Sequence, residues 1–530
     1  MGIRKYLMVT IGTIILLALS IFFYTASMPD GPEETGIDPP AAVQERRPSP
    51  TPTPVPAADE PQDTEETLYE AEDAVLDGLT LYTEPTEHGV TAKSGSGYVG
   101  AWDSDQSRLI FRVEAPDAGM YELMFLTAAR DGESYNTVIV NDRTFYDALY
   151  TGSRDFVPSS IRANLKEGPN VIVVETGWGG IYLDCLTVRT AAGIPTDVYH
   201  VEKTLSNENA SDHARRLMSF LADQYGKKTL AGQYNSDKGI DSPEIRELYK
   251  LTGKYPAIMG FEMSDYSPSR VAHGAETRQT EFALDWAEKG GIVTFVWHWN
   301  APKDLINTSE YPWWDGYLAD ATTFDLKKAL NGEDPEGYDL LLRDIDAIAE
   351  QLKILGDQDI PVLWRPLHEG SGGWFWWGAH GPDNYKKLWR LMYDRMTDTQ
   401  ALDNLIWVYN GQNADWYPGD EYVDIIAEDT YTRPRDYESQ FNLFAKAAGY
   451  TGARKIIGLS ENGAIPDPDL MYADNAGWSF FITWNDELVV DPDTKCISDE
   501  YNALSHFIKV YHHDRVITLD ELPDLCTYPK

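Results

Sequence analysis

The chain has 530 residues, of which 42% are hydrophobic, so it is long enough to bury more than one core. Its formal net charge of -41 argues against nucleic-acid binding, because a phosphate backbone would be repelled. Neutral polysaccharides carry no such penalty, and the 16 tryptophans and 31 tyrosines supply flat rings on which sugar faces can pack.

The N-terminal residues 1–28 predict an export signal. Arg4 and Lys5 precede an uncharged apolar run that ends near Ser27. The run is also long enough for an uncleaved membrane anchor, which needs roughly 20 apolar residues. Both alternatives predict a secreted or cell-surface protein that meets the membrane only through this segment.

Residues 29–67 predict a linker. Their central part, "PPAAVQERRPSPTPTPVPAADEPQDTEE", is rich in Pro, Thr and acidic residues and has no large apolar side chains. Such a segment cannot bury a core, so we expect an extended, polyproline-like connection.

Residues 68–192 predict an all-β sandwich. Short alternating runs such as "RLIFRVEA", "YNTVIVND" and "NVIVVETG" are separated by Gly, Asp and Asn. Because no pair of carboxylates stands beside a cleft motif here, we expect this domain to bind a ligand and not to cleave one.

Residues 199–530 predict a (β/α)8 TIM barrel, since eight apolar strands alternate with helical stretches. The strands are "TLAGQYN", "PAIMGFEMS", "GIVTFVWHW", "PVLWRPLHE", "NLIWVYNG", "VDIIAEDTY", "KIIGLSENG" and "GWSFFITWND". An open doubly wound sheet is the alternative, but no Gly-rich phosphate loop follows the first strand.

Functional residues of such a barrel gather at the carboxyl ends of its strands. Those ends carry His298, His368-Glu369, Tyr431, Glu461 and Trp484. Each could instead have a structural role: the two histidines could be satisfied within the core. At least one aromatic residue of the run 375–377 is expected to point inward, and the insert "YPWWDGY" (311–317) either extends the cleft or packs as a loop.

Two facing carboxyl groups are what glycosidic bond cleavage requires. Glu369 precedes the aromatic run "GSGGWFWWG", whose apolar rings would favour its protonated form, so it is the better acid. Glu461 lies in the polar turn "LSENGA" and is the better nucleophile. A separation of about 5–5.5 Å would predict retention of anomeric configuration, and about 6.5–9.5 Å inversion.

The segment "RPLHEGSGGWFWWG", the later "LSENG" and the earlier "LAGQY" and "PAIMGFEMSDYSPSR" together resemble glycoside hydrolase family 26, best known for endo-β-1,4-mannanases. The resemblance implies a retaining double displacement without a catalytic cofactor, with Glu369 as acid/base and Glu461 as nucleophile. It also implies a sugar subsite lined by His298, His368, Trp374, Tyr431 and Trp484.

Three positions depart from the pattern of that family, where Met-Asn commonly follows the acid and Asp commonly stands at position 262. This chain has Gly370-Ser371 and Glu262 instead. The family also contains β-1,3-xylanases and mixed-linkage glucanases, so mannan, glucomannan or galactomannan is the first expectation and another β-glycan the second. A third hypothesis is a non-catalytic glycan-binding barrel, against which the presence of both glutamates argues.

The sandwich opens with "LYEAED" and closes with "WGGIYLDCLTV", which together resemble a carbohydrate-binding module of family 35. The resemblance implies a structural calcium ion held by Glu70, Glu72 and Asp184, as suits a hard cation. Alternatively, the two glutamates only face solvent on an edge strand. Sugar contacts are expected from the loops 94–100 and 176–180, with Trp178 as the stacking residue and Asn136 nearby.

The three cysteines, Cys185, Cys496 and Cys526, form neither a disulfide framework nor a zinc motif. Pairing of the last two and free thiols both remain open. We expect a monomer.

Overall fold

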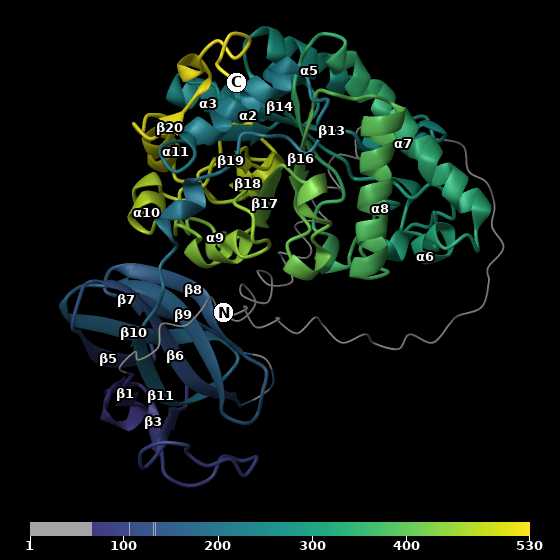
Figure 1. The fold of residues 1–530 in the computed structure, drawn as a ribbon. Coiled ribbons are helices and arrows are strands. Elements are labelled where there is room, and N and C mark those ends of the chain that lie inside the picture. Colours follow the sequence, from purple (N-terminus) through teal and green to yellow (C-terminus); the bar gives the residue numbers. More distant parts are fainter. Residues whose placement is uncertain (1–65, 105, 131, 133) are drawn as a thin grey trace. The chain divides into compact units, whose positions relative to one another are not determined.

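The computed structural model describes residues 66–104, 106–130, 132 and 134–530 (Figure 1). The predicted signal or anchor, and the predicted linker up to residue 65, lie outside these residues. Among the described residues, no helix combines the length and the apolar character needed to cross a membrane.

The first domain is a sandwich of two antiparallel sheets, as predicted. One sheet has the order β3-β4-β11-β6-β9, with β1 paired to β11, and the other has the order β2-β5-β10-β7-β8. The strands are β1 (Thr67–Glu70), β2 (Val75–Asp77), β3 (Thr80–Tyr82), β4 (Tyr98–Gly100), β5 (Arg108–Ala115), β6 (Gly119–Ala129), β7 (Ser134–Val140), β8 (Arg143–Thr151), β9 (Val157–Leu165), β10 (Gly168–Trp178) and β11 (Ile181–Thr190).

Alternation along the strands builds the core of this sandwich. In β5, the side chains of Leu109, Phe111, Val113 and Ala115 are buried, while the residues between them face outward or are half-buried. Because successive side chains point to opposite faces of a strand, each sheet has one apolar face. The apolar faces of the two sheets pack together, so their residues form one cluster.

The second domain is a closed parallel barrel. Strands β13 to β19 pair in sequence, and β12 pairs with both β19 and β13, so the sheet closes on itself and the open-sheet alternative is excluded. The barrel strands are β12 (Thr229–Tyr234), β13 (Ile258–Glu262), β14 (Ile292–Val296), β15 (Val362–Arg365), β16 (Leu405–Tyr409), β17 (Ile425–Thr430), β18 (Ile456–Asn462) and β19 (Phe480–Thr483), with the short β20 (Val516–Ile517) beside β12.

Helices surround these strands (Figure 1). They are α2 (Asp212–Gln224), α3 (Pro243–Thr252), α4 (Pro268–Val271), α5 (Gln279–Glu288), α6 (Leu326–Leu330), α7 (Pro335–Gly356), α8 (Pro382–Asp394), α9 (Phe441–Ala448), α10 (Pro468–Ala473) and α11 (Leu504–Tyr511).

Local sequence explains where the longest helix begins and which face it buries. The Asp334 side chain accepts a hydrogen bond from the backbone N–H of Gly337, and Pro335 occupies the first helical turn, where no N–H is needed. The apolar positions spaced three and four apart along α7 are fully buried against the barrel.

Strand β12 is buried along its whole length, as expected for a parallel sheet covered on both faces. The barrel is therefore a rigid scaffold whose carboxyl-end loops are free to carry chemistry.

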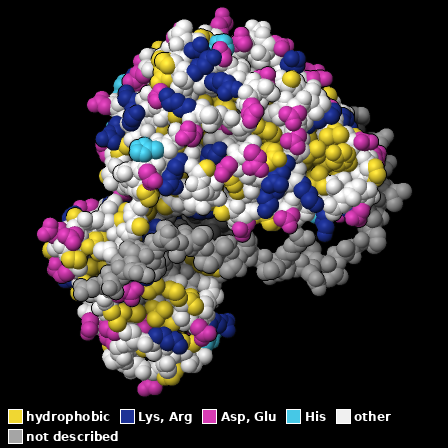
Figure 2. Space-filling view, viewed as in Figure 1, with side chains coloured by type: hydrophobic (Ala, Val, Ile, Leu, Met, Phe, Trp, Pro, Cys, Tyr) yellow, Lys and Arg dark blue, Asp and Glu magenta, His cyan; other side chains and the backbone are white. Residues whose placement is uncertain are grey.

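The acidic side chains are spread among basic ones over the face shown in Figure 2.

Candidate active site

Glu369 lies on a loop with an unusual backbone just after β15. Leu367 and Glu369 both have φ of 50°, a left-handed conformation that non-glycine residues rarely adopt. The Tyr385 hydroxyl donates to the Leu367 carbonyl at 2.8 Å, and the Glu369 N–H donates to the Asn410 carbonyl at 2.7 Å. The surrounding contacts thus hold a strained loop, as is frequent at functional sites.

The carboxyl of Glu369 is 7% exposed and has a partner on each oxygen. Trp374 Nε1 donates to Oε2 at 2.9 Å, and Gln412 Nε2 lies 3.5 Å from Oε1. Burial, with a further contribution from the negative charge of Glu461, raises the pKa of Glu369 to about 7. A carboxyl with this pKa can still hold a proton near neutral pH, as a general acid must.

Glu461 lies near the end of β18 and is 5% exposed. Its Oε1 accepts a hydrogen bond from Arg365 Nη2, and its Oε2 accepts one from the Tyr431 hydroxyl at 2.5 Å. The two donors fix the direction of the carboxylate.

Three carboxyl groups meet at this end of the barrel. One oxygen from each of Glu369, Asp429 and Glu461 lies within 4.8 Å of the other two. Arg365 is 1% exposed and donates to both Asp429 and Glu461, so the protein itself supplies positive charge to the cluster. Burial raises the pKa of Asp429, and the charges of Glu461 and Glu369 add to this while Arg365 opposes it.

Two histidines and a tryptophan line a neighbouring part of the site. His368 Nε2 lies 3.2 Å from His298 Nε2, and the His298 ring centroid is 5.9 Å from that of Trp484. Trp484 in turn packs on Tyr234, with centroids 4.5 Å apart. The last residue of β12 and residues that follow β14, β15 and β19 therefore converge here.

The aromatic run after Glu369 divides into one exposed and three buried rings. Trp374 is 47% exposed, whereas Phe375, Trp376 and Trp377 are at most 1% exposed, so the prediction that at least one of these three points inward is confirmed. The indole N–H of Trp377 donates to the His368 carbonyl at 2.9 Å, which ties the buried rings to the loop that carries Glu369.

The glycines of this loop are required by close packing. A Cβ on Gly370 would lie 2.3 Å from the ring of Tyr385, and one on Gly372 would lie 2.1 Å from the ring of Trp374. The family commonly has Met-Asn at positions 370–371. In this chain the ring of Tyr385 fills the space that a side chain at position 370 would need, so glycine stands there.

Comparison with known proteins now decides the family. The sequence profile of glycosyl hydrolase family 26 matches residues 206–521, more than half of the chain. The chain belongs to glycosyl hydrolase family 26. A second profile, that of carbohydrate binding module family 35, matches residues 67–191 of this family 26 protein.

Relatives of this family 26 chain include fungal and bacterial proteins. It is 41% identical over 462 residues to a mannan endo-1,4-beta-mannosidase of Thermothelomyces thermophilus, covering 87% of this chain and 91% of that protein. It is 32% identical over 307 residues to one of Bacillus subtilis, covering 53% of this chain and 82% of that protein. The crystal structure of the Podospora anserina GH26-CBM35 beta-(1,4)-mannanase superimposes with a TM-score of 0.60 at 35% identity, covering 87% of this chain and 99% of that one.

Sequence reasoning placed Glu369, Glu461, Tyr431, Trp374, His298, His368 and Trp484 among the site residues, and the structure brings them together. It did not assign a role to Arg365 or Asp429. The sequence did contain a signal for Arg365. It is a charged residue at the end of the buried strand "VLWR", and a buried charge needs a partner.

In the binding module, the carboxylates expected to hold calcium are tied to one loop. Ser94 and Ser96 donate to Glu70 and Glu72, while the backbone N–H of Ser94 donates to Asp184 at 3.1 Å. Oε2 of each glutamate is buried without a hydrogen-bond partner. Burial, with the charges of the two glutamates, raises the pKa of Asp184 to about 6. Unpaired buried carboxylate oxygens fit a hard cation.

The predicted sugar contacts of the module differ in exposure. Trp178 is 45% exposed, with the ring of Tyr135 at 6.4 Å. Asn136 is fully buried: its Nδ2 donates to the Glu175 carbonyl at 2.9 Å, and its Oδ1 accepts from the Ser134 hydroxyl. A sugar contact by Asn136 would require exchange of these bonds. The loop 94–97 adjoins the carboxylates.

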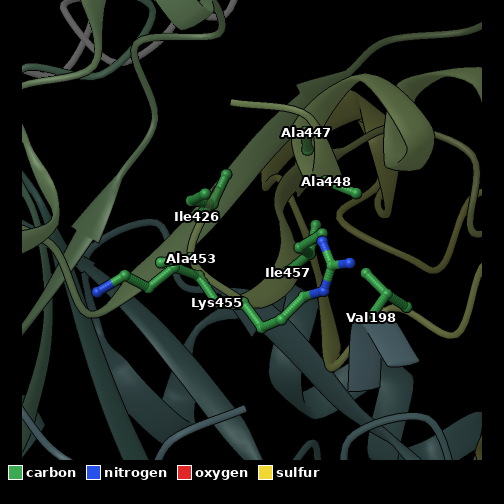
Figure 3. Close-up of a pocket in the computed structure, with 8 residues that line it drawn as sticks. Val198, Ile426, Ala447, Ala448, Ala453, Lys455 and Ile457 are labelled. Carbon is green, nitrogen blue, oxygen red and sulfur yellow. The ribbon is translucent and has the colours of Figure 1, made fainter. Parts of the chain in front are cut away.

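A shallow depression lies at the other end of the barrel strands (Figure 3). Ile426 and Ile457, the second residues of β17 and β18, line it together with Ala447 and Ala448 of α9. It has no enclosed space for a water molecule, so it offers no ligand site.

All three cysteines are unpaired, with Cys185 buried and the other two exposed.

Proposed function

We propose that this protein is a retaining endo-β-1,4-mannanase that hydrolyses mannan, glucomannan or galactomannan. The observation that carries the proposal is the pair Glu369 and Glu461, with carboxylate oxygens within 4.8 Å of each other at the mouth of a family 26 barrel. This separation supports retention, which requires about 5–5.5 Å, over inversion, which requires about 6.5–9.5 Å. The names of the relatives support mannan as the substrate.

The reaction follows from the partners of the two glutamates. In the first step, Glu461 attacks the anomeric carbon as the bond to the leaving oxygen breaks, and Glu369 gives its proton to that oxygen. In the second step, Glu369, now ionised, takes a proton from water, which attacks the same carbon and releases Glu461. Before the attack, Arg365 and Tyr431 hold the nucleophile by its two oxygens.

The remaining predicted residues take supporting roles in this proposal. His368, His298 and Trp484 bind the sugar whose bond is cleaved, and Trp374 forms part of the aromatic wall beside the acid. No cofactor takes part in the chemistry.

The family 35 module has a binding role in the proposal: it raises the local enzyme concentration on the polysaccharide through Trp178. Glu70, Glu72 and Asp184 hold a structural calcium ion, whose positive charge would compensate three neighbouring carboxylates. A signal or anchor at residues 1–28 directs the chain out of the cytoplasm, a linker leads from there to β1, and the enzyme acts as a monomer.

The test is incubation of the purified protein with mannan, mixed-linkage glucan, β-1,3-xylan and defined manno-oligosaccharides, followed by product chain length and NMR of the first anomer released. We expect internal cleavage of mannan with the β-anomer formed first. An α-anomer would reject retention, cleavage of another glycan alone would reject mannan, and binding without reducing-end release would indicate a non-catalytic protein.

A further inference from the structure

A chain of hydrogen bonds runs from the end of β13 to the loop that carries the acid. Glu262 Oε2 lies 2.5 Å from His298 Nδ1, and His298 Nε2 lies 3.2 Å from His368 Nε2. His368 immediately precedes Glu369. The acidic residue at position 262, where the family commonly has the shorter Asp, is thus two hydrogen bonds away from the residue beside the acid.

Glu262 is held as an acceptor at this place. Its Oε1 accepts the backbone N–H groups of both His298, at 3.0 Å, and Ser264, at 2.9 Å. Burial opposes ionisation, but the interaction with His298, with the backbone N–H of Ser264, outweighs it and lowers the pKa of Glu262. An ionised carboxylate can only accept, so the hydrogen of the contact with His298 belongs to Nδ1 of the imidazole.

The state of His298 in turn determines what His368 can do. His368 is 1% exposed, and burial, with the neighbouring His298 and Arg365, lowers its pKa well below the usual range, so it is neutral and carries one N–H. Its Nδ1 has no partner, and its ring packs on Phe375 with centroids 4.8 Å apart. The contact with Nε2 of His298 is therefore the hydrogen bond that orients the His368 ring.

The two side chains of the first contact are partly exposed. Glu262 is 24% exposed and His298 16% exposed, whereas Arg365, which holds the nucleophile, is 1% exposed. The carboxylate and the first imidazole thus keep some accessible surface, while the second imidazole, at 1% exposed, is buried.

We infer that Glu262 is a positioning residue of the active site: it fixes the tautomer and orientation of His298, and through it the orientation of His368, for the sugar whose bond is cleaved. The inference rests on the proposed function. A sugar hydroxyl both donates and accepts, so an imidazole whose donor and acceptor nitrogens are fixed before binding recognises one arrangement of hydroxyls. Without Glu262, His298 is free to change tautomer or rotate, and the pair loses its single arrangement.

The experiment compares Glu262→Gln, Glu262→Ala and Glu262→Asp with Glu288→Gln, which makes the same change at an exposed position on α5. Active sites are titrated with a slow fluorinated mannobioside, so misfolded protein does not count. kcat and KM are measured on mannotetraose and on an aryl β-mannobioside with a dinitrophenolate leaving group, which needs no acid catalysis.

We expect Glu262→Gln and Glu262→Ala to lower kcat/KM about 10- to 100-fold on both substrates, chiefly through kcat, as for a misplaced binding group. Glu262→Asp should recover part of the loss, and Glu288→Gln should match the wild type. Unchanged kinetics per titrated site would overturn the inference. So would a loss confined to mannotetraose, because the residue would then act on proton transfer by Glu369. A wild-type protein that cleaves no mannan would instead reject the proposed function.

Discussion

The barrel mouth and the exposed end of the binding module use aromatic and polar side chains in opposite ways. At the barrel mouth, Glu369 and Glu461 are 7% and 5% exposed, and every carboxylate oxygen has a hydrogen-bond partner. On the module, Trp178 leaves 45% of its surface open between glycines. Breaking a glycosidic bond needs charges fixed in a water-poor site before the substrate arrives, whereas holding a polymer needs only an open flat surface.

The largest effect is expected at the barrel mouth. Glu461→Gln keeps the size of the nucleophile but cannot attack, so hydrolysis of glucomannan should fall by about 10³-fold or more. The activity of Glu369→Gln on glucomannan should fall similarly. With a dinitrophenolate leaving group, which departs without a proton, this variant should keep a fast first release of phenolate and then turn over slowly, because the second step has lost its base. Rates are followed by reducing ends and by released phenolate, with Glu288→Gln as control. Wild-type rates in the Glu461 variant would remove it from the chemistry.

Calcium should affect the module and leave the barrel unchanged. Removing the ion with a chelator leaves Glu70, Glu72 and Asp184 to repel one another, so the unfolding transition of the module should move to lower temperature. At free calcium of 100 times Kd the stabilisation is about 2.7 kcal/mol.

Scanning calorimetry with and without chelator, beside kcat on mannopentaose, checks this expectation. A double Glu70→Gln/Glu72→Gln variant should lose the response to calcium. An unchanged transition in the wild type, or a fall in kcat on the short substrate, contradicts a purely structural ion in the module.

Loss of the exposed ring should weaken binding without touching the chemistry. Trp178→Ala should bind insoluble mannan about tenfold more weakly, because ring stacking on a sugar face contributes on the order of 1–2 kcal/mol. Its kcat on mannotetraose should equal that of the wild type. Leu81→Ala, a similarly exposed apolar residue of the module at 43%, is the control. Equal pull-down by both variants would show that the module binds elsewhere.

The smallest effect is a shift in pH dependence. Activity needs Glu369 protonated, so kcat/KM should decline as pH rises through about 7. The Trp374 N–H stabilises the ionised form and so lowers this pKa. Trp374→Phe removes the donor, raises the pKa of Glu369, and should move the alkaline limb upward by about half a pH unit, since Trp374 is half exposed. If the alkaline limb of the pH profile stays at the same pH or moves to lower pH, Trp374 does not lower the pKa of Glu369.

Much of this site was predictable because the strand pattern is regular. Eight apolar runs imply a closed parallel barrel, and such a barrel gathers its carboxyl-end residues at one rim. Glu369 and Glu461, which end the fourth and seventh runs, were therefore expected to face each other. Likewise the alternation in β5 predicted a sandwich, and the aromatic neighbours of Glu369 predicted a raised pKa.

The tertiary structure alone decided how the charges are paired. A register shift between β17 and β18 sets Asp429 opposite Glu461, and Arg365 reaches both from β15. The contact between Glu262 and His298 spans 36 positions, and the left-handed backbone at Leu367 and Glu369 turns the acid loop.

The sequence by itself determined the barrel, the sandwich and the two glutamates, because hydrophobic period and residue type are local properties. Only the folded chain determined the direction, distance and protonation of each polar group. These depend on strand register and on side chains that lie far apart along the chain, so they cannot be predicted from the hydrophobic periodicity.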